Sequence, residues 1–196
     1  MRAEFERVTG LDDVVRHAAG LSARTLVFDV EPLVAYWDGG QAALDEGIAR
    51  VLGKVAVLSA VHVVCFATNS ARRPSAVPSQ AAVQVVYLAS AGKPVQTAAY
   101  RHFPRPGMVI GDQVATDGIL ARRLGYAFLL FDPQLTEVPP GPRLMGAWGR
   151  LVRPLLFTGT ASKELTAALS TGTFAARFWP PRPFREPLPL RFWRRF

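Results

Sequence analysis

Cysteine and histidine are scarce in this chain, and their scarcity excludes several kinds of site. Cys65 is the only cysteine, so an intramolecular disulfide framework and a cysteine-rich metal site are both excluded. The three histidines, His17, His62 and His102, are scattered and show none of the spacings typical of zinc ligands. Cys65 lies within an apolar run, and we interpret it as a core residue.

Long hydrophobic runs are also lacking. The longest, residues 55–68, is interrupted by Ser59 and His62 and is too short to span a bilayer. The first ten residues include two glutamates and no apolar segment, so no secretory signal is expected. These features predict a cytoplasmic protein.

Acidic residues are fewer than basic ones, and this imbalance is distributed unevenly along the chain. The 196 residues contain 23 Lys and Arg against 15 Asp and Glu, a formal charge of +8, and only three of the cations are lysine. Residues 177–196 alone hold six arginines and one glutamate, a net of +5, which leaves +3 for the other 176 residues. Arginine prefers planar anionic partners such as phosphate. The basic character therefore belongs mainly to the C-terminal tail.

Short apolar, β-rich runs alternate with helical stretches, a pattern typical of a parallel sheet with crossover helices. The five predicted strands are residues 25–28, 61–67, 83–88, 107–110 and 127–131. Helices are predicted at 41–52, 94–101 and 115–124, and a further candidate at 71–80 is interrupted by Pro74 and Pro78. The strands are apolar almost throughout, which indicates burial on both faces. We expect an α/β, Rossmann-like fold: a parallel five-stranded sheet with helices on both faces.

The composition changes after Asp132. Ten of the sixteen prolines lie from residue 133 onward, and the alternation of strands and helices stops there. We expect one domain at residues 1–135 and a C-terminal extension at 136–196. This extension is predicted to be helical at 144–157 and 162–169, and then extended or disordered in a stretch rich in proline, arginine and aromatic residues.

Polar side chains follow four of the predicted strands. Ligands of open α/β sheets bind beyond the carboxyl ends of the strands, so these side chains are candidate site residues. They are Asp29 and Glu31 after the first strand, Thr68 and Asn69 after the second, Lys93 after the third, and Asp112 and Asp117 after the fourth. Carboxylates hold hard cations, and a lysine offsets charge on a phosphoryl group. The set suits Mg²⁺-assisted phosphoryl transfer.

Each of these residues also has a purely structural interpretation. Asp29 and Glu31 are compatible with a strand end and the turn that follows it, and residues 68–70 with a helix N-cap. Lys93 is compatible with a solvated surface lysine, and Asp117 with an ion pair on a helix surface. The order of the whole set along the chain favours the functional interpretation.

Four sequence strings carry a family resemblance. They are D-V-E-P-L-V-A-Y-W-D from Asp29 to Asp38, T-N-S from Thr68 to Ser70, A-G-K-P from Ala91 to Pro94, and I-G-D-Q-V-A-T-D from Ile110 to Asp117 with R-L-G shortly after it. In this order they resemble the motifs of the haloacid dehalogenase-like (HAD) phosphatases, specifically the uncapped, class IIIA, YqeG-like branch. The resemblance covers roughly residues 20–132. It implies a HAD fold with no cap domain and Mg²⁺-dependent hydrolysis of phosphate monoesters.

The resemblance also implies catalytic and phosphate-binding roles. Asp29 would attack phosphorus and form an aspartyl-phosphate intermediate. Glu31 would occupy the acid/base position that protonates the leaving oxygen and later activates water. Thr68 and Asn69 would hold the phosphoryl oxygens, and Lys93 would offset charge on the phosphoryl group and on Asp29.

The implied cofactor is Mg²⁺, bound at the acidic residues. Asp29 and Asp112 would ligate it together with the backbone carbonyl of Glu31, and Asp117 would orient this ligand shell.

Two positions depart from the family pattern. Glu31 replaces an aspartate, which displaces the carboxyl group by about 1 Å, and a misplacement of that size lowers rates by about 10²-fold. Leu33 replaces a threonine, which removes one polar group near the phosphate loop, and Pro32 lies between Glu31 and Leu33. Two hypotheses follow: a competent phosphatase, and a catalytically weakened or inactive HAD-fold binding protein.

The chain between Asp29 and Asp112 is fully used by the predicted sheet and its crossovers, so no inserted cap fits. An open site suits a phosphate that projects from a large molecule, such as a protein or a membrane lipid. Relatives in this branch include phosphatidylglycerophosphate phosphatases, which points the same way. Trp37 is expected either at the edge of this site or in the core.

The tail combines aromatic residues with arginines. Phe178 and Trp179 stand next to Arg177, and residues 191–196 read R-F-W-R-R-F. Such a segment suits an anionic membrane surface, which would make the protein peripheral at a membrane. A proline-rich strap or a disordered tail is an equal alternative, and a nucleic-acid or protein ligand is less favoured. The sequence carries no signal for an oligomeric state.

Overall fold

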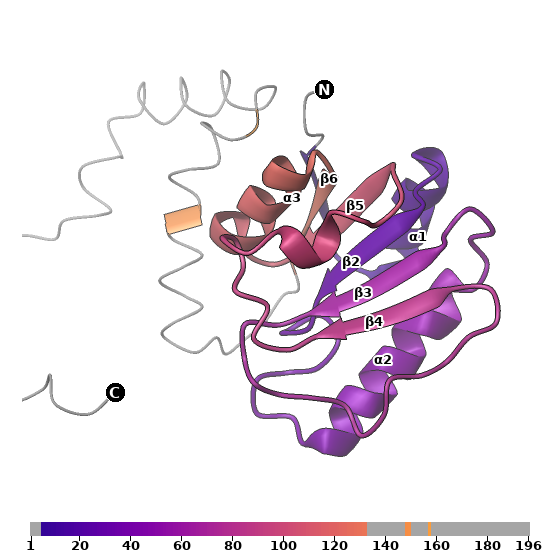
Figure 1. Ribbon diagram of the computed structural model, residues 1–196, viewed down its shortest axis with the longest axis vertical. Coiled ribbons are helices and arrows are strands. Elements are labelled where there is room, and N and C mark those ends of the chain that lie inside the picture. Colours follow the sequence, from indigo (N-terminus) through magenta and orange to yellow (C-terminus); the bar gives the residue numbers. More distant parts are fainter. Residues whose placement is uncertain (1–4, 133–147, 150–156, 158–196) are drawn as a thin grey trace, which may run out of the picture. The chain divides into compact units, whose positions relative to one another are not determined.

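The structure is a computed structural model that describes residues 5–132, 148, 149 and 157 (Figure 1). Within these residues six strands form one sheet in the order β1-β6-β5-β2-β3-β4, and all neighbouring pairs are parallel. The strands are β1 (Phe5–Val8), β2 (Thr25–Asp29), β3 (Val63–Ala67), β4 (Gln84–Leu88), β5 (Gly107–Gly111) and β6 (Ala127–Phe131). The helices are α1 (Leu11–Gly20), α2 (Gln41–Val55) and α3 (Ile119–Leu124), with a 3-10 turn η1 (Ala98–Tyr100) and a π-helical turn η2 (Val114–Gly118).

The central strands bring the candidate residues to one edge. β2, β3 and β5 consist almost entirely of apolar residues and are buried along their whole length, as expected for parallel strands covered on both faces. Their register places Asp29 beside Ala67. Because parallel strands all point the same way, the residues that follow β2, β3 and β5 meet at the carboxyl edge of the sheet.

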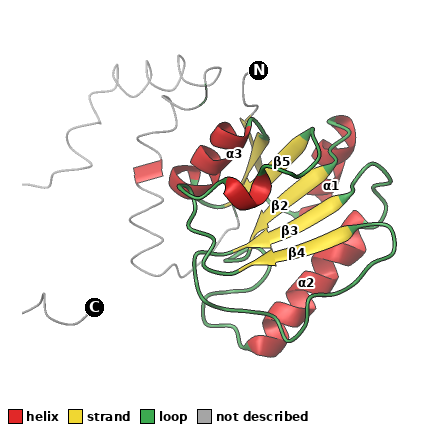
Figure 2. Ribbon diagram, in the orientation of Figure 1, coloured by secondary structure: helices red, strands yellow, loops and turns green. Residues whose placement is uncertain are grey.

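Helices cover both faces of the sheet (Figure 2). One face, with Phe28 and Phe66, packs against α1 and α2. The other face, with Val27 and Cys65, packs against η1 and α3. The α/β fold, the parallel sheet and the helices on both faces are therefore confirmed, as is the core position of Cys65.

The sheet has one strand more than predicted. All five predicted strands form, and β1 adds a sixth at the edge next to β6. Its sequence, F-E-R-V, contains two exposed charged residues, so it shows little of the hydrophobicity that marks the central strands. The sequence interpretation also missed α1, although Asp12 and Asp13 in its first turn are a helix-start signal.

Two of the predicted helices differ in the structure. The segment at 94–101 contains only the turn η1, because the N–H groups of Val95 and Gln96 both bond to the carbonyl of Gly92 and form a separate turn. Residues 71–80 contain no helix, since Pro74 and Pro78 lack N–H donors. The helix predicted at 41–52 forms as α2, and the one at 115–124 forms as η2 followed by α3.

Most of the predicted extension lies outside the described residues, including the expected helix at 162–169 and the polyproline-like tail. Of the expected helix at 144–157, only Trp148, Gly149 and Phe157 are described. Phe157 is buried, and its ring centroid lies 5.7 Å from that of Phe128 and 5.3 Å from that of Phe5. In the described ranges, no helix has the length and hydrophobicity needed to cross a membrane.

Truncating Phe157 should destabilise the protein strongly. Phe157→Ala removes a buried ring that contacts two others, and core truncations of this kind cost about 3–5 kcal/mol. Trp148→Ala removes a side chain that is 57% exposed, and it should change the free energy of unfolding by less than ~0.5 kcal/mol. Urea unfolding measures both variants. A loss for Phe157→Ala as small as that expected for Trp148→Ala would show that Phe157 contributes nothing to the core.

Candidate functional site

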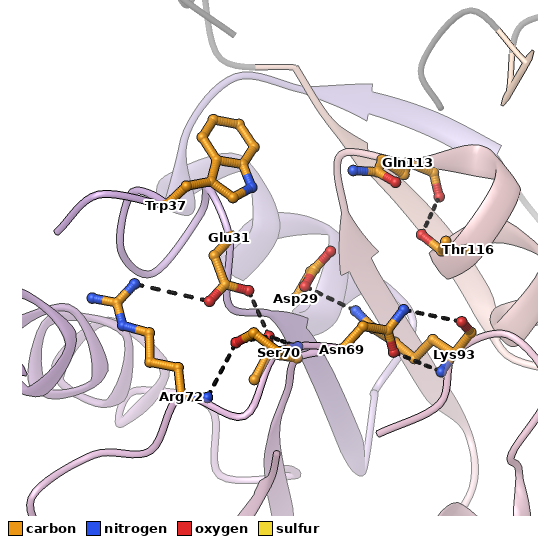
Figure 3. A pocket seen from close by; sticks show the side chains of 10 residues that line it. Asp29, Glu31, Trp37, Asn69, Ser70, Arg72, Lys93, Gln113 and Thr116 are labelled. Atoms are coloured by element: carbon orange, nitrogen blue, oxygen red, sulfur yellow. Dashed lines mark hydrogen bonds and ion pairs between the residues drawn. The ribbon is translucent and has the colours of Figure 1, made fainter. Parts of the chain in front are cut away.

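The candidate site lies at the carboxyl edge of the sheet. Asp29 is the last residue of β2, Thr68 follows β3, Asp112 follows β5, Lys93 follows β4, and Asp117 lies in η2. A pocket of about 350 Å³ opens here, lined by Asp29, Glu31, Trp37, Thr68, Asn69, Ser70, Arg72, Lys93, Gln113 and Thr116 (Figure 3). The structure thus brings the residues singled out in the sequence to one place, and Trp37 lies at the site.

The ammonium group of Lys93 joins two carboxylates. Its Nζ lies 2.8 Å from Oδ1 of Asp29 and 2.7 Å from Oδ1 of Asp117. None of the three side chains is more than 10% exposed. Buried charges are tolerated when they are paired, so Lys93 allows two carboxylates to remain close together in the protein interior.

Burial and neighbouring charges shift the pKa values of these groups. Burial lowers the pKa of Lys93, but Asp117 and Asp29 outweigh this effect and raise it above its usual value. The pKa of Asp29 is raised well above its usual range by burial and then by Asp117, while Lys93 opposes both. Lys93 therefore stays charged, and a further cation near Asp29 would favour its ionised form.

Asp112 completes a group of three carboxylates. One oxygen from each of Asp29, Asp112 and Asp117 lies within 4.8 Å of the others. Burial, followed by the charge of Asp117, raises the pKa of Asp112 to about 7. Its buried Oδ1 has no hydrogen-bond partner in the part of the chain that the structure describes. Clustered oxygen donors with one unpaired buried atom fit a hard divalent cation.

Gly111 makes room for Asp117. The turn η2 brings Asp117 back against the end of β5, and its N–H bonds to the carbonyl of Gln113 at 2.8 Å. A Cβ on Gly111 would overlap the Asp117 carboxyl group. The hydroxyl of Thr116 and the N–H of Gln113 donate to Oδ2 of Asp117 at 3.3 and 3.4 Å. The G-D-Q-V-A-T-D string therefore holds one buried carboxylate in place.

Asn69 fixes the backbone of Lys93. Its Oδ1 accepts a 2.7 Å hydrogen bond from the Lys93 N–H, and its Nδ2 donates a 3.0 Å bond to the Lys93 carbonyl. A side-chain amide has two N–H groups, so Asn69 retains one for a ligand. Arg123 of α3 also donates to the neighbouring Pro94 carbonyl, at 2.9 Å.

The Glu31 side chain is not part of the carboxylate group. Its Oε2 accepts a 2.7 Å hydrogen bond from the Thr68 hydroxyl, and its Oε1 lies 3.8 Å from the guanidinium of Arg72. Oγ1 of Thr68 also accepts a 3.0 Å bond from the Ser70 N–H. Because a threonine hydroxyl has a single proton, Thr68 directs that proton to Glu31 and not into the pocket.

Sequence reasoning assigned no role to Ser70, Arg72, Gln113 and Thr116, which also line the pocket. Gln113 and Thr116 stand inside the G-D-Q-V-A-T-D string, so that motif was the available signal. Arg72 had no such signal, since it bonds to carbonyls of residues 32 to 36 positions earlier in the chain.

No family model, curated protein or solved structure matches the chain. Function is therefore inferred from the chemistry and geometry of the site.

Asp112→Asn should stabilise the metal-free protein more strongly as the pH rises. The native protein keeps a proton on Asp112 up to about pH 7, whereas the usual carboxyl pKa is 3.8. The contribution of Asp112 to wild-type stability should therefore fall as the pH rises between these values and then level off. Thermal unfolding in EDTA should show a Tm gain on the order of 5 °C near pH 8 and almost none near pH 4.

The same melts with added Mg²⁺ provide the control. Excess Mg²⁺ should raise the Tm of the wild type near pH 8, because it binds the ionised native state, and should affect Asp112→Asn much less. A Tm difference between the two proteins that is constant with pH would contradict the raised pKa.

Proposed function

We propose that this protein is a Mg²⁺-dependent phosphomonoesterase of the HAD type, with Asp29 as the nucleophile. The observation that carries the proposal is the Lys93 ammonium between the Asp29 and Asp117 carboxylates, beside Asp112, at a surface pocket. A nucleophilic carboxylate, a fixed cation and a carboxylate group fit for a metal are the parts that phosphoryl transfer requires. The resemblance of four motifs to the HAD phosphatases supports the same chemistry.

The charge balance supports a metal requirement. The site holds two more carboxylates than cations: Asp29, Glu31, Asp112 and Asp117 against Lys93 and Arg72. When these groups are ionised, the excess negative charge would repel a phosphate dianion. A bound Mg²⁺ would supply the positive charge that offsets the carboxylates and polarises a phosphoryl oxygen.

The reaction would proceed in two displacements. A carboxylate oxygen of Asp29 forms a bond to phosphorus while the bond from phosphorus to the leaving oxygen breaks, and the leaving oxygen takes up a proton. Water then attacks the phosphorus of the aspartyl-phosphate, loses a proton, and releases inorganic phosphate and the free carboxylate of Asp29. By resemblance, Glu31 donates the first proton and accepts the second.

In this proposal, Lys93 and Asn69 would bind the phosphoryl oxygens. The Lys93 ammonium has three N–H groups, two of which face Asp29 and Asp117, so the third is available to a phosphoryl oxygen. Asn69 holds the Lys93 backbone, and its second amide N–H would serve as a further donor to the phosphoryl group. Thr68 would serve as a donor to phosphate only after its hydroxyl leaves Glu31.

An open site favours a large substrate. The chain from Asp29 to Asp112 is used by α2, β3, β4, η1, β5 and their connections, which supports a site without an inserted cap. Such a site would reach a phosphate that projects from a protein or from a lipid such as phosphatidylglycerophosphate.

The position of Glu31 favours a second candidate function. Its carboxylate is bonded to Thr68 and faces Arg72, so one group assigned to proton transfer is held by protein partners. A catalytically weakened or inactive HAD-fold protein that binds Mg²⁺ and phosphate would tolerate this arrangement.

Replacing the nucleophile should abolish turnover. Asp29→Asn removes the attacking charge, and hydrolysis of p-nitrophenyl phosphate with Mg²⁺ should fall by at least about 10³-fold. Asp13→Asn changes a half-buried carboxylate of α1 that pairs with Arg16 and does not line the pocket, so it should leave the rate unchanged. Acid quenching with a ³²P-labelled substrate should trap an aspartyl-phosphate on the wild type only. Activity that survives Asp29→Asn would exclude Asp29 as the nucleophile.

The same assay separates the two candidate functions. If the protein is a competent phosphatase, the wild type itself should hydrolyse p-nitrophenyl phosphate. A wild type that binds Mg²⁺ and phosphate without turnover, with activity appearing in Glu31→Asp, would identify the weakened protein.

The arginine-aromatic tail is proposed to bind an anionic membrane surface. Replacing Arg191, Arg194 and Arg195 by alanine in the full chain should lower co-sedimentation with anionic vesicles by at least about tenfold, at about 1 kcal/mol for each cation. Turnover of p-nitrophenyl phosphate should stay the same. Equal recovery of both proteins on these vesicles would exclude this role, and retention of single-stranded DNA instead would identify a nucleic-acid partner.

A further inference from the structure

Arg72 connects segments that are distant in the sequence. Its guanidinium donates hydrogen bonds to the carbonyls of Tyr36 at 2.8 Å and Gly40 at 3.0 Å, and it also donates to Gly39. The side chain is only 17% exposed although it lines the pocket. A planar guanidinium reaches several acceptors at once, and a lysine ammonium at the end of a thinner chain does not reproduce this geometry.

The backbone carbonyl groups that Arg72 contacts carry no net charge, so they do not neutralise its guanidinium. Glu31 supplies the negative charge, with its Oε1 3.8 Å from the guanidinium and its side chain 11% exposed. The other Glu31 oxygen accepts the hydroxyl proton of Thr68. Arg72 and Thr68 therefore each hold one oxygen of the Glu31 carboxylate, and Figure 3 shows Arg72 beside Glu31.

These contacts hold both ends of one loop. Glu31 is the second residue of the connection from β2 to α2, and Gly40 is its last. The same loop carries Trp37 at the pocket (Figure 3). Arg72 is itself anchored, because the Tyr87 hydroxyl of β4 donates to its carbonyl at 3.0 Å. One guanidinium thus ties the loop to the segment that follows β3.

We propose that Arg72 is a positioning residue that sets the orientation of Glu31 and of the Trp37-bearing turn relative to Asp29. Its effect on turnover rests on the proposed phosphatase function, whereas its effect on the loop rests on the contacts alone. Arg72 also accounts for the glutamate at position 31: the longer side chain ends between a guanidinium and a hydroxyl, which together define where its carboxylate lies.

The test compares Arg72→Met and Arg72→Lys with Arg73→Met, a control at the exposed neighbouring arginine. In Arg72→Met, hydrogen exchange of the amides in residues 31–40 should accelerate by at least about tenfold. The kcat should fall by about 10²-fold, while KM and the Mg²⁺ affinity measured by calorimetry should change by less than about threefold. Arg73→Met should match the wild type in every readout. Arg72→Lys keeps the positive charge but loses the planar set of N–H donors, so its exchange rates in residues 31–40 should lie between those of the wild type and Arg72→Met. It replaces Arg72→Met in the test if that variant does not fold.

A double-mutant cycle tests whether Arg72 acts through Glu31. Glu31→Gln combined with Arg72→Met should be no slower than the slower single variant, because both changes disrupt the same interaction. Independent, multiplicative losses, or unchanged exchange in residues 31–40 of both Arg72 variants, would overturn the proposal. If the wild type shows no turnover, the phosphatase function fails, and the exchange measurement alone then decides whether Arg72 positions the loop.

Discussion

The ion pairs of the Lys93 ammonium with Asp29 and Asp117 are the interactions on which the rest of the site depends. Three carboxylates whose oxygens lie within 4.8 Å would repel one another strongly in a buried place. Lys93 offsets part of that repulsion at 2.7 to 2.8 Å. Several other features serve this cluster: Asn69 holds the lysine backbone, and the missing side chain of Gly111 admits the Asp117 carboxyl group.

The same pocket contains a second, separate polar network. Glu31, Thr68 and Arg72 join the loop after β2 to the segment after β3. None of the three belongs to the cluster of Asp29, Asp112 and Asp117. The two hypotheses about activity differ only in this network. A phosphatase needs the Glu31 carboxylate to exchange a proton with the leaving group, whereas a weakened protein keeps it as a fixed structural contact. Both hypotheses include Asp29, Lys93 and the carboxylates of Asp112 and Asp117 unchanged.

The sequence predicted most of the sheet because its central strands are continuous apolar runs between turn signals. It missed β1, where Glu6 and Arg7 are exposed and the strand is recognisable only by its pairing with β6. The sequence predicted a helix at 94–101 that does not form, because helix propensity does not show that this segment folds into separate turns after Lys93. Phe157 was also missed. It contacts Phe5 and Phe128, which lie far from it in the sequence, and no local sequence pattern predicts such a contact.

By itself, the sequence determined which residues stand at the carboxyl edge: once the strands are parallel, Asp29, Thr68 and Asp112 must follow their strands at the same edge of the sheet. Only the tertiary structure decided what each side chain does there. Thr68 donates to Glu31, and the three clustered acids are Asp29, Asp112 and Asp117 without Glu31. Thr68 and Glu31 are 37 positions apart, and Asp29 and Asp112 are 83 positions apart. Over such separations, one methylene group or one absent Cβ determines which partner a carboxylate reaches.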